Sequence, residues 1–125
     1  MSAYIVIHKD TYKDVMEASN YIYEYLDTLY PGKVHAYHDG SFIDIDDRIQ
    51  IDFRYGIDPC KFGGLLVNYY YTDNDGLIVD ALEQCTTKHN GKRLKNLDQV
   101  AQIVKFYMIL FDEIDAWLDK EGWYE

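Results

Sequence analysis

A long amphipathic run near the C-terminal end constrains the fold of this chain more than any other feature. Its apolar residues recur at three- and four-residue steps across about six helical turns: Leu97, Val100, Val104, Tyr107, Phe111, Ile114 and Leu118. Beside it runs a second apolar stripe of Ile103, Leu110 and Trp117. Asn96, with Gln99 three residues later, predicts an N-terminal cap. So wide an arc exceeds what one sheet face usually covers, so we expect part of it to meet another chain.

The N-terminal part of the chain predicts a buried strand followed by another amphipathic helix. Residues 3 to 8 are β-branched and apolar, which is typical of a buried strand. Asp10 or Thr11 then caps a helix with one core stripe: Val15, Ala18, Ile22, Leu26 and Leu29. This helix ends at Pro31 and Gly32, because proline cannot continue it and glycine tolerates the exit geometry.

The middle of the chain predicts a β meander. The expected strands cover residues 33 to 38, 41 to 45, 48 to 55 and 65 to 71. Tight turns are expected at Asp39-Gly40 and at Asp46-Asp47. Apolar and polar residues alternate over residues 48 to 55, which indicates one face on the core and one face in water. A short helix over residues 77 to 85 and a basic connection over residues 88 to 95 precede the long helix.

These patterns together predict an α+β fold in one domain covering residues 1 to 125. The expected order is strand, helix, four strands and two helices. We expect a mostly antiparallel sheet of four to five strands, with the helices packed on one face and a long C-terminal helix.

The charge of the chain restricts its partners. Twelve lysines and arginines stand against 22 aspartates and glutamates, which gives a formal net charge of −10. This charge repels phosphate backbones, so we expect no direct nucleic-acid binding and favour a basic protein surface as partner. The sequence has no apolar run of membrane-spanning length and no recognisable signal peptide, so we expect no membrane association and a cytoplasmic protein.

No motif identifies a catalytic site, a metal site or a cofactor. The densest acidic cluster is Asp39, Asp44, Asp46, Asp47 and Asp52. Paired carboxylates of this kind can hold Mg²⁺ or Mn²⁺, but the carboxylate-x-lysine pair of restriction-type nucleases is missing. The histidines lack zinc-ligand spacing, and neither Cys60 nor Cys85 lies in a nucleophile signature. We therefore expect no catalytic residues, no metal and no cofactor.

Two separate acidic stretches are the candidate partner-binding residues. Asp44, Asp46 and Asp47 lie in the meander, and Asp112, Asp115 and Asp119 share one face of the long helix. Like charges at these spacings, close to a helix C-terminus, cost stability, which favours a basic partner. Tyr69 or Tyr71 would serve as an aromatic anchor, because tyrosine is enriched in interface hot spots.

The leading hypothesis is a small non-catalytic binding protein that occupies the nucleic-acid groove of a nuclease or another basic protein. Phage-encoded anti-restriction and anti-CRISPR proteins act in this way, and they share small size and acidity with this chain. One alternative is a metal-dependent hydrolase that uses the meander aspartates. The other is a structural or immunity-type subunit that forms a homodimer through the long helix.

Overall fold

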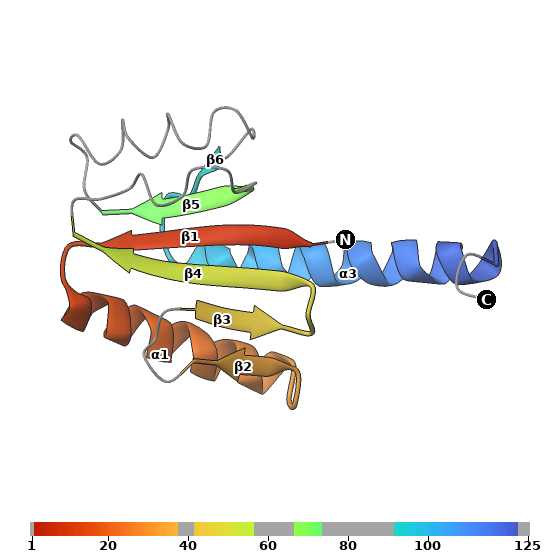
Figure 1. The fold of residues 1–125 in the computed structure, drawn as a ribbon, viewed down its shortest axis with the longest axis horizontal. Coiled ribbons are helices and arrows are strands. Elements are labelled where there is room, and N and C mark those ends of the chain that lie inside the picture. Colours follow the sequence, from red (N-terminus) through yellow and green to blue (C-terminus); the bar gives the residue numbers. More distant parts are fainter. Residues whose placement is uncertain (1, 38–41, 57–66, 74–91, 123–125) are drawn as a thin grey trace.

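A computed structural model describes residues 2–37, 42–56, 67–73 and 92–122 of the chain (Figure 1). Its elements are β1 (Ala3–Lys9), α1 (Tyr12–Leu29), β2 (Val34–Ala36), β3 (Phe42–Ile45), β4 (Ile49–Tyr55), β5 (Tyr69–Thr72), β6 (Lys92–Arg93) and α3 (Asp98–Lys120). Several expectations lie outside the described residues: the turn at Asp39-Gly40, the helix over residues 77 to 85, and the roles of Cys60 and Cys85.

Strand β1 lies inside the sheet and pairs in parallel with β4 on one side and β5 on the other. β5 pairs in parallel with β6, whereas the β2–β3 and β3–β4 pairs are antiparallel. The expected mostly antiparallel sheet of four to five strands is therefore wrong. Within the described ranges, six strands form a mixed sheet in the order β2-β3-β4-β1-β5-β6. Periodicity identifies strands but not their neighbours, and β1 inserts between two strands that chain order would place side by side.

The expectation that helices cover one face of the sheet is confirmed for α1 and α3. Their apolar stripes enter the same buried cluster as the alternate residues of β1, β3 and β4. This cluster contains Ile5, Ile7, Ile43, Ile45, Ile49, Ile51 and Phe53 from the strands, Val15, Ala18, Ile22 and Leu26 from α1, and Val100, Val104, Met108 and Phe111 from α3. Figure 1 shows α3 passing behind the sheet and reaching beyond the ends of the strands.

Local sequence explains where both helices begin. The Thr11 side chain accepts a hydrogen bond from the Asp14 backbone N–H at 3.2 Å, as an N-cap does. At the start of α3, Asn96 and Gln99 exchange the reciprocal bonds of a capping box, which confirms the predicted cap. The prediction for Leu29 is wrong, because this side chain is 47% exposed. Leu29 is the last residue of α1, and at this position the helix extends beyond the part of the sheet that buries Leu26.

The sheet face opposite the helices is less exposed to solvent than the alternation of apolar and polar residues in β4 predicts. Asp52 points to this face but is only 4% exposed. Its carboxylate accepts hydrogen bonds from the Tyr4 hydroxyl, from the Gln50 amide at 2.9 Å and from the Arg54 guanidinium at 3.1 Å. Burial, and next the bond to Asp52, raise the pKa of Tyr4, so the phenol remains a donor. A buried carboxylate is tolerated here because these donors surround it.

In the described part of the chain, no helix combines the length and the apolar character that a membrane crossing requires.

We predict that Tyr4→Phe destabilises the protein by about 1–3 kcal/mol, because the buried Asp52 carboxylate loses one of its donors. Tyr12→Phe is the matched control, since Tyr12 is 50% exposed, and should change stability by less than about 0.5 kcal/mol. Urea denaturation of the two variants beside the wild type measures both effects. Equal stabilities for the two variants would contradict the role given to Tyr4.

Candidate acidic binding surface

The turn between β3 and β4 holds its aspartates in a fixed backbone conformation. Asp46 and Asp47 both have a φ of 55°, in the left-handed region that aspartate tolerates better than most residues. The Arg48 N–H donates to the Ile45 carbonyl at 3.0 Å, which closes the turn. The Asp47 N–H donates to the Asp44 carboxylate at 3.2 Å. The prediction of a tight turn at Asp46-Asp47 is therefore confirmed, and the turn presents three carboxylates together.

Arg48 joins this turn to the long helix. Its guanidinium donates to the Asp112 carboxylate at 2.6 Å and to the Asp115 carboxylate at 2.5 Å. Its Nε lies 3.7 Å from a carboxylate oxygen of Asp46. The two acidic stretches, separate in the sequence, thus converge on one arginine. We call Asp44, Asp46, Asp47, Asp112 and Asp115, with Arg48 at their centre, the acidic surface.

Negative charge exceeds positive charge on the acidic surface, and much of it faces solvent. The Asp112 side chain is 69% exposed, although it binds Arg48. Each carboxylate offers about four lone-pair positions, so one bond to Arg48 leaves the others available. The hydrogen bond that Arg48 donates to Asp112 is the main cause that raises the pKa of Arg48, and the guanidinium stays charged. These five carboxylates outnumber Arg48 and Lys33, whose backbone carbonyl accepts from the Asp46 N–H at 2.9 Å, so this region stays anionic.

Asp44 is an aspartate of the acidic surface whose charged form is disfavoured by its surroundings. Burial raises its pKa, and the charge of Asp47 acts in the same direction, while the hydrogen bond from the Asp47 backbone opposes them. Its strand neighbour across the β2–β3 pair is His35. The negative charge on the Asp44 carboxylate therefore lowers the stability of the folded state.

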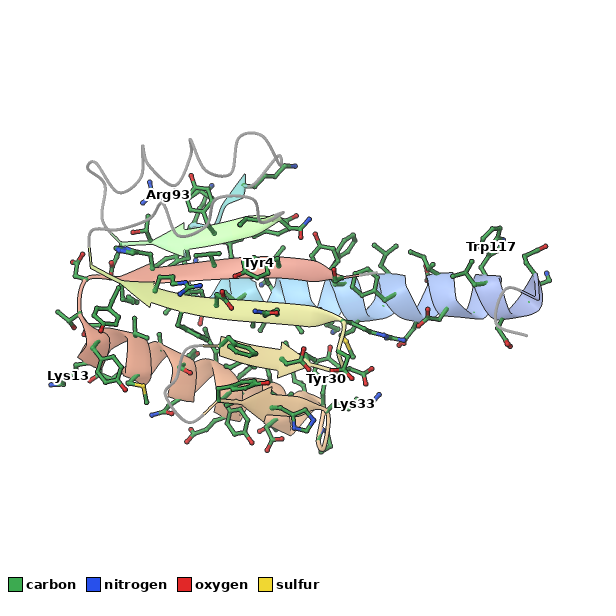
Figure 2. All side chains as sticks on the ribbon, viewed as in Figure 1. Tyr4, Lys13, Tyr30, Lys33, Arg93 and Trp117 are labelled. Carbon is green, nitrogen blue, oxygen red and sulfur yellow. The ribbon has the colours of Figure 1, made fainter. Side chains whose placement is uncertain are left out.

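Two further residues lie close to the acidic surface. Asp119 is exposed on α3, one turn beyond Asp115 towards the C-terminus. Tyr30, which follows α1, is half-buried, and burial and then the nearby charge of Asp112 raise its pKa. Figure 2 shows Tyr30 and Lys33 near the end of the sheet beyond which α3 extends. Tyr30 is therefore the tyrosine that the fold places beside the carboxylates.

The tyrosines singled out in the sequence lie elsewhere. Tyr69 and Tyr71 pair with Ile5 and Ile7, so they point to the helix-covered face of the sheet. Both are half-buried against the core. Tyr69 makes an edge-to-face contact with Tyr107 of α3, with the ring centroids 6.3 Å apart. The fold brings together five of the six predicted aspartates and places Asp119 next to them, but it does not bring either tyrosine to the acidic surface.

Sequence reasoning missed Arg48 and Tyr30. The available signal was that Arg48 directly follows Asp44, Asp46 and Asp47, as the only basic residue in that stretch. An arginine at the end of an acidic run is a natural bridge to a second acidic segment. Nothing in the sequence identified Asp112 and Asp115 as that segment, because the contact spans 64 and 67 residues.

The buried His8, outside the acidic surface, has both ring nitrogens within hydrogen-bond distance of other groups. The buried His8 places Nε2 at 2.7 Å from the Gly56 carbonyl and Nδ1 at 3.0 Å from the Thr72 hydroxyl. A carbonyl can only accept, so Nε2 carries a proton and donates to Gly56. Among the described residues, no three histidine, cysteine, aspartate or glutamate side chains are arranged to hold a metal ion.

A groove of about 470 Å³ separates α1 from α3. Its floor includes the buried Ile22 and Leu26, and its mouth includes Tyr21, whose hydroxyl donates to Asp98 at 3.1 Å. This bond raises the pKa of Tyr21. The groove lies between the helices, and none of the predicted partner-binding residues lines it.

We predict that Arg48→Ala loosens α3, because Asp112 and Asp115 lose their common partner and face the turn carboxylates without it. Amide hydrogen exchange over residues 112 to 120 should accelerate, with a loss of about 1 kcal/mol in unfolding free energy. Arg48→Lys should recover only part of the protection, since an ammonium cannot bind two carboxylates as a fork does. Unchanged exchange in Arg48→Ala would refute the proposed linkage.

We also predict that Asp44→Asn stabilises the protein at pH 7. The folded state binds the Asp44 proton more tightly than the unfolded state, so wild-type stability falls as pH rises from the ordinary towards the raised pKa. Asparagine removes this penalty and can still accept from Asp47. The melting temperature should rise by about 1–2 °C at pH 7, and the gain should disappear where Asp44 is protonated in both states. Glu24→Gln, at an exposed position on α1, controls for the loss of one charge.

Comparisons with known proteins found no relative of this chain. No protein-family description, no curated protein and no solved structure matches the chain.

Proposed function

We propose that this protein is a small, non-catalytic binding protein that docks on the nucleic-acid-binding surface of a basic protein and inhibits it as a decoy. The observation that carries this proposal is the convergence of the two acidic stretches around Arg48. A lone run of aspartates is typical of a solvated loop. Two runs held together by an arginine fork form a surface of defined geometry, which a partner can recognise.

The spacing of the helical carboxylates supports the decoy. Asp112, Asp115 and Asp119 rise by about 4.5 Å and then by about 6 Å along the axis of α3. One strand of duplex DNA carries a charge about every 3.4 Å of helix axis. The spacing of these carboxylates is therefore of the same order as the spacing of phosphates, and Asp46 of the turn is linked to them through Arg48. Cations that contact consecutive phosphates would find acceptors at comparable intervals.

The rigidity of this region also supports the proposal. The turn is closed by backbone bonds, and the side chain of Arg48 holds Asp115 at 2.5 Å. A preorganised anionic surface loses little conformational entropy when it binds. Its net charge should accelerate association with a cationic groove and make binding sensitive to salt.

Fewer observations support the other two candidate functions. Metal-dependent hydrolysis through the meander aspartates has no observation in its favour in the described residues. The Asp46 carboxylate lies 3.7 Å from Arg48 instead, and the Asp44 carboxylate accepts a hydrogen bond from the backbone of its own turn. Dimerisation through α3 draws on the exposed apolar side chains of that helix.

We predict that the protein displaces a labelled DNA duplex from a DNA-cleaving nuclease of the restriction or RNA-guided type. The triple variant Asp46→Asn, Asp47→Asn and Asp112→Asn should lose potency by about tenfold or more, while it leaves Asp115 to pair with Arg48. Displacement should also weaken steeply between about 50 and 200 mM salt. Fluorescence anisotropy of the duplex measures both effects.

The matched control is the triple variant Glu17→Gln, Glu24→Gln and Asp27→Asn on α1, which changes the net charge by the same amount. It should keep potency within about threefold, because general charge contributes less than local geometry. Equal losses in the two triple variants would show that only overall charge matters. Failure to displace DNA from any nuclease of these classes would reject the decoy function.

A further inference from the structure

The groove between α1 and α3 contains none of the residues of the acidic surface. Its volume of about 470 Å³ falls in the range of small-ligand sites, about 300–1,000 Å³. Tyr21 and Tyr25, four residues apart on α1, line one wall and are 54% and 50% exposed. The buried side chains of Ile22 and Leu26 close the floor. The groove therefore has an apolar base and a wall of aromatic rings that solvent reaches.

The opposite wall of the groove, on α3, carries two opposite charges. Asp98 and Lys105 are two helical turns apart, so they lie on the same side of α3, separated by about 10 Å along its axis. Ala101 lies between them and has only a methyl side chain, which leaves space opposite the tyrosines of α1. The groove thus has a carboxylate towards one end and an ammonium group towards the other.

Both charges are available to a ligand. The Asp98 carboxylate accepts one hydrogen bond, from the Tyr21 hydroxyl at 3.1 Å. This bond positions the carboxylate at the groove and leaves its other lone-pair positions open. Lys105 forms no ion pair within the described part of the chain, although the sequence has 22 acidic residues and only 12 lysines and arginines. A lysine without an ion pair in so acidic a chain favours an anionic group on the ligand.

We propose that this groove binds a short apolar peptide with free ends, about three residues long, with its terminal ammonium group at Asp98 and its terminal carboxylate at Lys105. An extended chain spans about 3.3–3.6 Å per residue, so three residues cover the distance of about 10 Å between the two charges. The apolar side chains of the peptide pack on the rings of Tyr21 and Tyr25 and on Ala101. The inference goes beyond the proposed function and does not rest on it.

The opposite charges at the two ends of the groove favour this peptide over other occupants. A simple fatty carboxylate would pair with Lys105 but would bring its apolar tail to the Asp98 carboxylate. A helix confined between the two charges would have about seven residues, and so short a helix is marginal in water. A peptide with free ends matches both charges. It also carries no net charge, so the net charge of −10 on the protein does not repel it.

The tripeptide Leu-Ala-Leu tests the proposal in four forms: with free ends, N-acetylated, C-terminally amidated, and capped at both ends. In an NMR titration with the full chain, the free form should bind with a dissociation constant of about 1 mM or below. Each single cap should weaken binding by about threefold or more, because it removes one charge. Gly-Gly-Gly with free ends, which lacks apolar side chains, should bind about tenfold more weakly. No binding of the free Leu-Ala-Leu at about 10 mM would overturn the proposal.

Variants of the protein assign each end of the peptide to its charge. Asp98→Asn, which can still accept from Tyr21, should weaken the free peptide by about threefold and leave the acetylated peptide unaffected. Lys105→Gln should weaken the free peptide by about threefold and leave the amidated peptide unaffected. Glu113→Gln and Lys120→Gln are the matched controls, because both residues are exposed on α3 outside the groove, and they should stay within about 1.5-fold.

A further variant tests the location of the peptide. Ala101→Leu should fill the space between the helices and weaken binding by about tenfold or more, at little cost in helix propensity. Ala116→Leu is the matched control, because Ala116 is exposed on the same helix outside the groove. Thermal unfolding shows that both variants are folded. Unchanged binding in Ala101→Leu would place the peptide outside the groove and overturn the proposal.

The remaining outcomes identify a different occupant. If the doubly capped peptide binds as tightly as the free one, the groove takes an internal segment of a longer chain, and the proposal is wrong. If octanoate binds as tightly as Leu-Ala-Leu and competes with it, the ligand is a simple carboxylate, and the proposal is also wrong. Neither result affects the displacement of DNA, because the aspartates of the acidic surface lie outside the groove. The two proposals therefore fail separately.

Discussion

The parallel pairing of β1 with both β4 and β5 is the constraint on which the rest of the structure depends. Because β1 and β4 run in the same direction, with Ala3 opposite Ile49, the turn that begins β4 lies at the N-terminal edge of the central strand. Helix α3 packs on the sheet face that α1 also covers, and it extends beyond this N-terminal edge of β1 (Figure 1). Arg48 therefore meets Asp112 and Asp115 because of how the central strands pair.

This arrangement gives the molecule one organised anionic region. Arg48 contacts three carboxylates, yet the surrounding aspartates outnumber it. An arginine in this position reduces repulsion enough for the carboxylates to remain close, while it leaves the region negative. The same helix that supplies Asp112 and Asp115 continues past its last core contact at Ile114 to Lys120.

Elements with strong periodicity were predictable from sequence. The helix stripes at Val15, Ala18 and Ile22, and at Val100 and Val104, were correct because burial at helical spacing leaves a clear pattern. The stripe failed at Leu29, where the sheet no longer covers the helix. The alternation in β4 located the strand, but it could not reveal that Asp52 is buried. That burial depends on Tyr4 and Arg54, and Tyr4 comes from a strand 48 residues away in the sequence.

The sequence by itself determined the α+β class, the two long amphipathic helices, the turn at Asp46-Asp47 and the acidity of two separate stretches. These properties follow from local spacing and composition, which one chain carries in full. Only the tertiary structure decided that β1 lies between β4 and β5, that Tyr69 and Tyr71 turn to the helix-covered face, and that Arg48 joins the acidic stretches. Each of these depends on pairing across long sequence separations, where many alternative neighbours have similar local preferences.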